Sequence, residues 1–283
     1  MTVDDDRYES IDVRPVAGTL GAEIGGVDLA ADLPDATVAE IRRAWLRHQV
    51  VFFRDQDLDL DHYQAFAERM GEPVEYPFVK GLEGHPKIIT IAKLEHETVN
   101  FGGVWHSDTT YLERPPMATM LLAREVPDAG GDTLWTSMYA AYETLSPGLQ
   151  QMLDGLRAVN TSAMADVSKT REDRIRDTGF EEERTYEAVH PVVRTHPETG
   201  RKALYVNPAH TARFEGWTEE ESRPLLDLLC THAVRPEFTV RFRWRPGSLA
   251  LWDNRCVWHN PINDYHGHRR VMHRITLAGD VPS

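Results

Sequence analysis

Apolar residues recur at the three- and four-residue spacing of a helix in several stretches of this chain. Residues Asp35 to Gln49 set one apolar stripe against a polar opposite face, which predicts an amphipathic helix. The stripe consists of Val38, Ile41, Ala44 and Trp45. The other predicted helices cover Asp61 to Met70, Tyr139 to Ala158 with a break at Ser146-Pro147, and Thr218 to Val234.

The last of these helices carries its own start signal. Thr218 is followed three residues later by Glu221, which is the pattern of a capping box. Leucines cluster along one side of the helix, at positions 225, 226, 228 and 229. We interpret this stripe as core or as a subunit interface rather than as part of a cofactor site.

Shorter runs rich in β-branched and aromatic residues predict strands. They are VVFF at 50–53, Ile88 to Lys93, Ala118 to Val126, Thr133 to Thr136, Ser248 to Asn254 and Arg270 to Ala278. Many strands with helices gathered to one side predict an α+β, mainly β fold. Because 283 residues suffice for one sizeable core, we expect a single domain spanning 1–283.

Composition narrows the range of partners and compartments. The formal net charge of −14 argues against nucleic acid and anionic membrane as partners, because both would repel the chain. Two cysteines, Cys230 and Cys256, do not form a disulfide framework and are compatible with a reducing compartment. The first ten residues are acidic and polar, and no apolar run approaches membrane-spanning length. These features predict a cytoplasmic protein.

The segment VWHSDTTY contains His106 and Asp108, two positions apart. With 13 histidines in the chain, roughly one such pair is expected by chance, so its context has to decide. The segment is rich in β-branched and aromatic residues, and an extended chain points residues two apart in the same direction. His106 and Asp108 are therefore expected to share one face.

A second pair of the same type serves as a comparison. His196-Pro197-Glu198 lies in the run HPETG between two strand-like segments, which is typical of a hairpin turn. We interpret this pair as part of a solvated turn and not as a ligand set.

A late histidine, His259, lies in the segment RCVWHNPINDYHGHR between two predicted strands, and we interpret that segment as a loop. Two imidazoles and one carboxylate on one side of a divalent metal form the facial triad of non-heme Fe(II) oxygenases. The sequence thus predicts that His106, Asp108 and His259 bind Fe(II). Cys256 is an alternative ligand, but such sites favour nitrogen and oxygen donors, so a buried thiol is the preferred interpretation.

Two arginines follow the late histidine on one predicted strand. Arg270, Met272 and Arg274 fall on one face of the strand, whereas Val271 and His273 fall on the other. Buried arginines are costly unless anions meet them, and their planar forks match carboxylates. The alternative is a pair of surface arginines on an edge strand. Together with the metal motif, the pattern favours an anion pocket.

Longer motifs show a close family resemblance that spans nearly the whole chain. They are VFFRDQ at 51–56, WHSDTTYLERPP at 105–116, GGDTLWTSMYAAYETLS at 130–146, HPVVRTHPETGRKALYVN at 190–207, WDNRCVWH at 252–259 and NDYHGHRRVMHRITLAGD at 263–280. These runs resemble the TauD/TfdA family of 2-oxoglutarate-dependent dioxygenases, nearest to the taurine dioxygenases. The resemblance implies a double-stranded β-helix, or jelly roll, with flanking helices.

The same resemblance implies roles for individual residues. It makes His106, Asp108 and His259 the Fe(II) ligands of an enzyme that also uses 2-oxoglutarate and O2. It places Arg270 and Thr133 on the distal carboxylate of 2-oxoglutarate. Arg274 is expected to face the acidic group of a small anionic organic substrate. The implied reaction hydroxylates that substrate and converts 2-oxoglutarate to succinate and CO2.

The substrate contacts of the taurine dioxygenases are not kept in this chain. At the corresponding polar positions the sequence has Tyr76, Val79 and Gly102, and Tyr205 stands where the family places an aromatic wall. An anion site with few polar contacts and more apolar wall suits a larger or less polar body. We therefore expect an alkyl or aryl sulfonate, a sulfate ester or a carboxylic acid rather than taurine. His210 is a further candidate for bordering the pocket.

Alternatives remain at this point. The same iron site serves desaturation or another biosynthetic oxidation in some enzymes, and a metal-binding jelly-roll protein without redox turnover, or a metal hydrolase, is a third class. Residues 163–188 are charged and poor in large apolar residues, so they are either a mobile lid over the iron or a solvated loop. By analogy with relatives, we expect a homo-oligomer, either a dimer or a tetramer.

Overall fold

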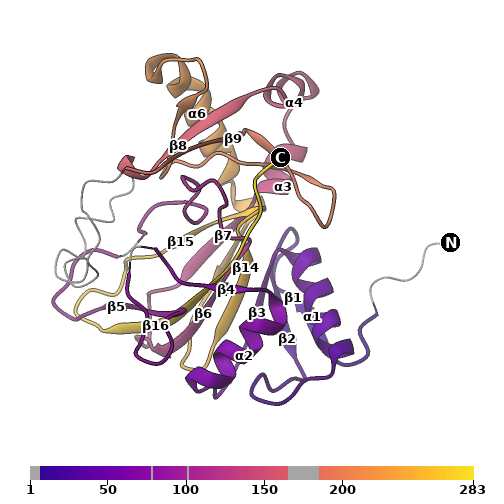
Figure 1. Cartoon of the computed structure of the whole chain (residues 1–283), viewed down its shortest axis with the longest axis vertical. Coiled ribbons are helices and arrows are strands. Elements are labelled where there is room, and N and C mark those ends of the chain that lie inside the picture. The colour runs from indigo at the N-terminus through magenta and orange to yellow at the C-terminus, as the bar shows by residue number, and fades with distance from the viewer. Residues whose placement is uncertain (1–6, 78, 101, 165–184) are drawn as a thin grey trace.

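The computed structural model describes residues 7–77, 79–100, 102–164 and 185–283. Its main sheet has eight strands, ordered β1-β2-β3-β14-β6-β16-β4, with β5 also paired to β16 (Figure 1). These strands are β1 (Asp12–Pro15), β2 (Ala22–Gly25), β3 (Val50–Phe53), β4 (Pro73–Val74), β5 (Ile88–Lys93), β6 (Ala118–Glu125), β14 (Leu249–Asp253) and β16 (Arg270–Leu277).

Three smaller sheets accompany the main one. One joins β13 (Thr239–Phe242), β7 (Thr133–Ser137) and β15 (Val257–Pro261), and a second joins β12 (Thr211–Phe214), β8 (Arg157–Thr161) and β9 (Glu187–Pro191). The third is a hairpin of β10 (Val193–Thr195) and β11 (Lys202–Leu204). The strand-rich organisation confirms the expectation of a mainly β fold.

The described helices gather in two places. Helices α1 (Asp35–His48) and α2 (Leu60–Met70) lie together beside the N-terminal strands, and α3 (Met138–Glu143), α4 (Pro147–Leu153) and α6 (Glu219–Ala233) lie at the opposite end of the molecule (Figure 1). Two 3-10 turns, η1 (Ser162–Met164) and η3 (Pro236–Phe238), complete the described helical segments. Among the described residues, no helix combines the length and the apolar character needed to span a membrane.

Alternation along the central strands gives the main sheet two buried faces. In β6, Leu121 and Ala123 face one hydrophobic core, whereas Met120 and Leu122 face another. Strands β3 and β14 alternate in the same way. The second core is closed by α1 and α2, which contribute Ile41, Trp45, Tyr63 and Phe66. The first core lies between the main sheet and the sheet of β7, β13 and β15.

The predicted helices are largely confirmed, and their boundaries follow local signals. The break at Ser146-Pro147 separates α3 from α4, with the Ser146 side chain accepting a hydrogen bond from the Leu149 amide. The capping box of α6 is present, since the Thr218 hydroxyl accepts from the Glu221 amide and the Glu221 carboxylate accepts from the Thr218 amide. The helix expected to run on to Ala158 is wrong at its end, because Arg157 already begins strand β8.

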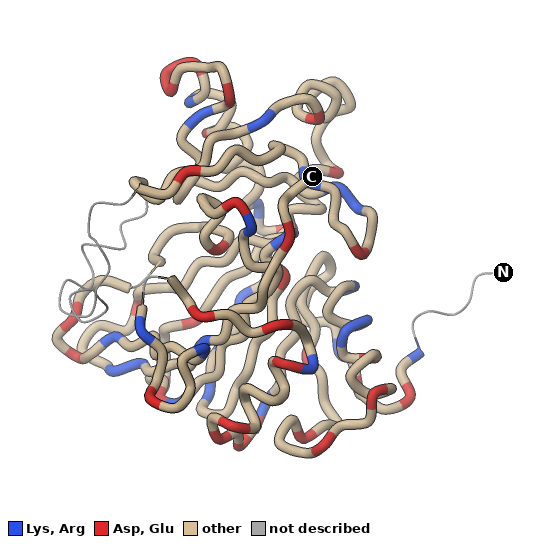
Figure 2. Tube along the Cα trace, in the orientation of Figure 1, with Lys and Arg blue, Asp and Glu red and all other residues tan. Residues whose placement is uncertain are grey.

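The leucine stripe of α6 belongs to the core. Leu226 and Leu229 are buried in it, whereas Leu228 is exposed. Charges of both signs are interspersed along the described surface, so the excess of acidic residues does not gather into one block (Figure 2).

Candidate metal centre and anion pocket

His106 and His259 lie directly opposite each other. His259 is on β15, so the interpretation of its segment as a loop between two strands is wrong at this residue. The amide of His106 donates to the His259 carbonyl at 3.1 Å, and the amide of His259 donates to the His106 carbonyl at 2.8 Å. This isolated antiparallel bridge brings the two imidazole ring centroids to 4.1 Å. Residues 153 positions apart in the sequence thus share one site.

Asp108 completes the group where the chain turns away from the bridge. The expected extended segment is interrupted here, because Thr109 adopts a positive φ of 42°. Asp108 Oδ1 nevertheless lies 3.7 Å from His106 Nε2 and 3.9 Å from His259 Nε2. One ligand atom from each of the three residues lies within 4.8 Å of the others. A single metal ion can be reached by all three.

Burial puts both histidines in the form that binds metal. Desolvation lowers the pKa of the His106 ring and lowers that of His259 well below its usual value, so both are neutral near pH 7. His106 Nδ1 lies 2.7 Å from the Val104 carbonyl, which can only accept, so Nδ1 carries the proton. The lone pair of His106 is therefore on Nε2, the atom that faces Asp108.

The two oxygens of Asp108 have different surroundings. Oδ2 accepts a hydrogen bond from the Thr119 hydroxyl at 2.6 Å and lies 2.8 Å from Arg274 Nη2, whereas Oδ1 faces the two imidazoles. Burial alone would raise the pKa of this carboxyl, but the Arg274 guanidinium, helped by the Thr119 hydrogen bond, holds it below its usual range. Asp108 is therefore a carboxylate with one oxygen available to a cation.

A cavity opens beside the triad between the main sheet and the β7-β13-β15 sheet. It is lined by Ile91, His106, Leu121, Thr133, Trp252, His259, Pro261, Arg270 and Arg274. Its walls are mainly apolar, and the polar groups are the histidines, one hydroxyl and two guanidinium groups. This composition is typical of a small-molecule site.

Arg270 and Arg274 are both 5% exposed, and both point to the cavity side of β16 as the alternation predicted. Nε and Nη2 of each are buried without a hydrogen-bond partner among the described residues. Arg274 Nη2 forms an ion pair with Asp108 Oδ2 at 2.8 Å, so Arg270 is the less engaged of the two arginines. Burial lowers the pKa of Arg270, since the charged form loses hydration. Two guanidinium groups thus have donors left for an anion.

Thr133 lies on the same cavity wall as Arg270. Its hydroxyl accepts from the Trp244 indole at 3.0 Å, which leaves its own proton available. Gly131, with a φ of +69°, lets the backbone pass close to Arg270, since an added Cβ would lie 3.2 Å from Arg270 Cδ. The structure therefore brings the expected hydroxyl and guanidinium together.

The residues expected to contact substrate divide into two groups. The ring of Tyr76 lies 4.9 Å from the Arg274 guanidinium carbon, and a Cβ added at Gly102 would lie 2.9 Å from His106 Cε1. Both positions are therefore beside the triad. Val79 is half-buried, and like Tyr76 and Gly102 it is not among the cavity-lining residues.

Tyr205 is not brought to the cavity. Its ring packs 5.9 Å from the His190 ring and 5.1 Å from the Arg194 guanidinium carbon, and it is not among the residues that line the cavity beside the triad. His210 borders the triad, with its ring centroid 6.2 Å from that of His106. Of the expected lid, residues 165–184 lie outside the described residues.

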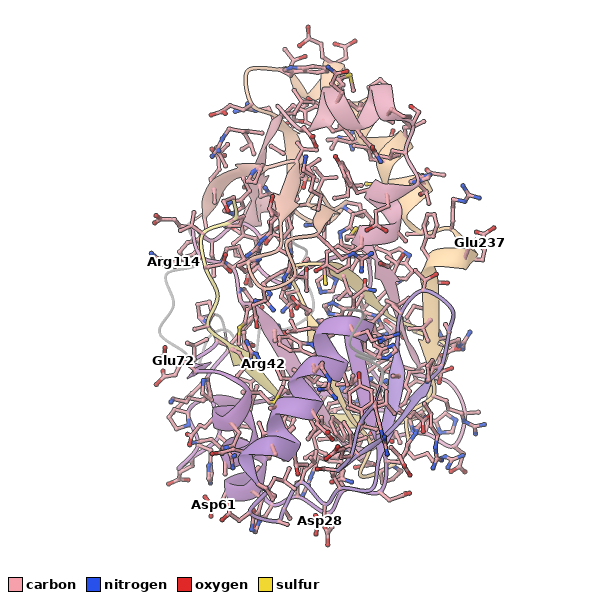
Figure 3. All side chains as sticks on the ribbon, turned by 90° about the vertical axis from the view of Figure 1, so that its right-hand side faces the viewer. Asp28, Arg42, Asp61, Glu72, Arg114 and Glu237 are labelled. Atoms are coloured by element: carbon pink, nitrogen blue, oxygen red, sulfur yellow. The ribbon has the colours of Figure 1, made fainter. Side chains whose placement is uncertain are left out.

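The comparison pair at 196–198 lies in the β10–β11 hairpin, and Glu198 is exposed there as expected for a solvated turn, but His196 is not. His196 is 1% exposed, and its Nε2 donates to Asp253 Oδ2 at 3.0 Å. Glu198 pairs with Arg255 and with Arg42 of α1, which is labelled in Figure 3. The hairpin tip is exposed at Pro197, Glu198 and Gly200, and only His196 turns inward to a partner distant in the sequence, which a local turn pattern does not reveal.

A second potential ligand group, His196, Asp253 and Cys256, has no free acceptor for a metal. Arg255 donates hydrogen bonds to both Asp253 carboxylate oxygens, at 2.8 and 2.7 Å. His196 Nδ1 accepts from two backbone amides at 3.2 Å, so its Nε2 carries the proton that Asp253 accepts. This cluster is a structural ion network, and Cys256 is a buried thiol as expected.

Sequence reasoning missed Thr119, Trp252 and Asn254. Trp252 lines the cavity with its ring 4.7 Å from that of His259, and Thr119 holds Asp108. Trp252 and Asn254 lie in the run WDN, which the family resemblance included without giving those residues roles.

Two neutral imidazoles and a carboxylate around a cation site, beside a cavity with two buried arginines, are typical of non-heme metal oxygenases that take anionic substrates. Comparison with known proteins agrees with this class. The model of the taurine catabolism dioxygenase TauD, TfdA family matches residues 12–276, so the chain belongs to that family. Its members are dioxygenases that use Fe(II), 2-oxoglutarate and O2, which confirms the expected enzyme class and cofactors.

Individual relatives cover nearly the whole chain. An alpha-ketoglutarate-dependent sulfate ester dioxygenase from Pseudomonas putida is 39% identical over 96% of this chain and 91% of its own. An alkylsulfatase from Acinetobacter baylyi is 35% identical over 96% of this chain and 86% of its own. The crystal structure of a taurine dioxygenase from Burkholderia xenovorans superposes with a TM-score of 0.83 at 40% identity, covering 97% of this chain and 93% of that one.

Proposed function

We propose that this enzyme hydroxylates a sulfate ester with an alkyl chain, at the carbon that bears the ester oxygen. The observation that carries the proposal is the pair of buried arginines with unpaired donors on one wall of the triad cavity. One such group suits the co-substrate carboxylate, and the other suits a second anion. The relatives named for sulfate esters and alkyl sulfates support this choice over a sulfonate or a carboxylic acid.

His106 Nε2, His259 Nε2 and Asp108 Oδ1 would hold Fe(II). The donor set fits, because the imidazoles are neutral and the one carboxylate oxygen has no other cation in front of it. Bound Fe(II) supplies the coupling of O2 reduction and 2-oxoglutarate decarboxylation to insertion of one oxygen atom into a substrate C–H bond, with succinate and CO2 released.

Arg270 and Thr133 would bind the distal carboxylate of 2-oxoglutarate. The guanidinium offers Nε and Nη2, and the hydroxyl offers its proton, so both carboxylate oxygens receive charge-assisted or directed hydrogen bonds. The cavity wall excludes water from this ion pair, and the attraction between its charges is stronger because the surroundings are less polar than water.

Arg274 would bind the sulfate group through Nε, which has no hydrogen-bond partner among the described residues, while Nη2 lies against Asp108. Ile91, Leu121 and Pro261 form an apolar wall for the alkyl part. Gly102 leaves space next to His106, where a side chain would collide. Once the carbon that bears the ester oxygen is hydroxylated, the product breaks down to an aldehyde and inorganic sulfate. No hydrolytic step is needed to release the sulfate.

The two facing sheets support the finer fold assignment as well. We infer that the main sheet and the β7-β13-β15 sheet form the double-stranded β-helix that the family resemblance implies. In this arrangement the triad sits between the sheets, with ligands supplied by β15 and by the segment that precedes β6.

The test is a coupled product assay. The purified enzyme is incubated with Fe(II), 2-oxoglutarate, O2 and one candidate from a set of hexyl sulfate, hexyl sulfonate, an aryloxyacetate and taurine. We expect hexyl sulfate to yield succinate, sulfate and hexanal in equal amounts, and Asp108→Ala to yield none. Sulfate release without 2-oxoglutarate would instead identify a hydrolase, and an unsaturated product would identify a desaturase.

A further inference from the structure

Behind the metal centre, three buried side chains form a chain of hydrogen bonds that ends on Asp108. Trp252 Nε1 donates to Asn254 Oδ1 at 2.9 Å, and Asn254 Nδ2 donates to Thr119 Oγ1 at 2.9 Å. The Thr119 hydroxyl then donates to Asp108 Oδ2 at 2.6 Å. Trp252 and Thr119 are direct partners in the β14–β6 register, so two central strands of the main sheet fix the geometry.

The direction of this chain is set by chemistry and not only by distance. An indole N–H can only donate, so Asn254 must turn its oxygen toward Trp252 and its amide hydrogens toward Thr119. A hydroxyl that accepts from the amide has one proton of its own, and that proton is directed to Asp108. Because the acceptor is ionised, this last hydrogen bond is the strongest of the three.

Asn254 holds the ligand segment through its backbone as well. Its carbonyl accepts from the Ser107 hydroxyl at 2.6 Å, on the residue next to Asp108. Thr119 is 0% exposed, Asn254 1% and Asp108 3%, so water does not compete for these bonds. The carboxylate is therefore held by Oδ2, and Oδ1 is left directed toward the two imidazoles.

We propose that Thr119 and Asn254 are positioning residues for the metal, which fix the rotation of the Asp108 carboxylate so that one oxygen faces the cation. The inference rests on the proposed metal ligands, but it concerns metal binding and not the choice of substrate. Partners that orient a ligand from behind typically change metal affinity by about 10- to 100-fold when they are removed.

The test measures binding of Co(II) alone, without 2-oxoglutarate, by calorimetry and by the visible absorption of the bound ion. Thr119→Val removes the hydroxyl at nearly constant shape, and Thr119→Ser restores it. Asn254→Asp keeps an acceptor for Trp252 but removes the donor to Thr119. The new carboxylate then attracts the Thr119 hydroxyl proton away from Asp108. Thr136→Val is the matched control, since Thr136 is also 0% exposed and bonds to the Ala233 carbonyl.

We expect Thr119→Val and Asn254→Asp to weaken Co(II) binding by about 10- to 100-fold and to change its spectrum. Thr119→Ser should bind and absorb like the wild type, and Thr136→Val should lose thermal stability without losing Co(II) affinity. The proposal is overturned if the first two variants match the wild type in affinity and spectrum, or if Thr136→Val loses affinity to the same extent. If Thr119→Val does not fold, the Co(II) affinity and spectrum of Asn254→Asp decide whether the proposal holds.

Failure of this inference is distinguishable from failure of the proposed function. If the wild type binds Co(II) tightly and the variants behave as expected, the positioning role holds even when no sulfate ester is converted. If the wild type binds no Co(II), the metal site and the positioning role are both wrong.

Discussion

Replacing Arg270 by Met is expected to weaken 2-oxoglutarate binding and, at the same time, to stabilise the substrate-free protein. The side chain is 5% exposed, and Nε and Nη2 have no hydrogen-bond partner among the described residues. A charge in this position costs free energy in the absence of its anion. Methionine fills a similar volume without that cost.

The magnitudes follow from the contacts. Losing one partner of a buried, hydrogen-bonded charge pair costs about 2–5 kcal/mol, and each 1.4 kcal/mol is a factor of ten. The KM for 2-oxoglutarate should therefore rise by at least about 30-fold. A buried unsatisfied donor costs about 1–3 kcal/mol, so removing it should raise the free energy of unfolding by a similar amount. For a chain of this size, each kcal/mol moves Tm by roughly 2–4 °C.

The assay pairs succinate formation at varied 2-oxoglutarate with thermal unfolding of the metal-free protein. Arg157→Met serves as the control, because Arg157 is half-exposed and pairs with Glu215 on the surface. Arg157→Met should leave the KM for 2-oxoglutarate unchanged and should change Tm by only a small amount. A lower Tm for Arg270→Met with an unchanged KM would refute the reasoning, because it would make Arg270 a structural residue.

Three further substitutions test the rest of the site. Arg274→Met should raise the KM for an anionic prime substrate by at least about 30-fold, with a much smaller change in the KM for 2-oxoglutarate, and equal changes in both would contradict separate anion sites. Gly102→Ala should weaken Co(II) binding, because its Cβ would lie 2.9 Å from His106 Cε1 on a backbone with a φ of +72°, and wild-type affinity would show that the loop yields freely. Burial, with a smaller contribution from Arg124, lowers the pKa of His273 to about 4, below the roughly 6.5 of the unfolded chain. The native state therefore binds fewer protons, so stability present above about pH 6.5 is lost as pH falls toward 4. His273→Leu should make the fall of Tm between pH 7 and 5 less steep. An equally steep fall would contradict the assignment of this pH dependence to His273.

How far the sequence predicts the fold depends on how local the signal is. Strands β5 and β16 were predicted almost to the residue, because β-branched runs with clear alternation end at polar segments. Strand β15 falls in the segment interpreted as a loop, because its pairing with β7 is distant in the sequence and leaves no local signal. Hydrogen bonds between distant strands decide such cases, and a local pattern does not contain them.

The candidate site divides in the same way. The metal ligands and both arginines came from residue chemistry, spacing and family resemblance, because few side chains can hold a divalent metal or an anion. Thr119 could not be found like this, since a threonine in a strand run has an ordinary packing explanation. Tyr205 was placed by alignment alone, and the structure packs it against His190 and Arg194 instead.

The two histidine–acid pairs show why identical spacing leads to different roles. At 196–198, every acceptor already faces a donor: His196 Nδ1 receives two backbone amides, and Glu198 receives Arg42 and Arg255. At 106–108, Asp108 Oδ1 and the two imidazole Nε2 atoms face one another, and they make no hydrogen bond among the described residues. Asp108 Oδ1 and His106 Nε2 are both acceptors, and two acceptors held this close in a buried place repel unless a cation lies between them. The balance of donors and acceptors, rather than the motif, therefore separates the metal site from the structural network.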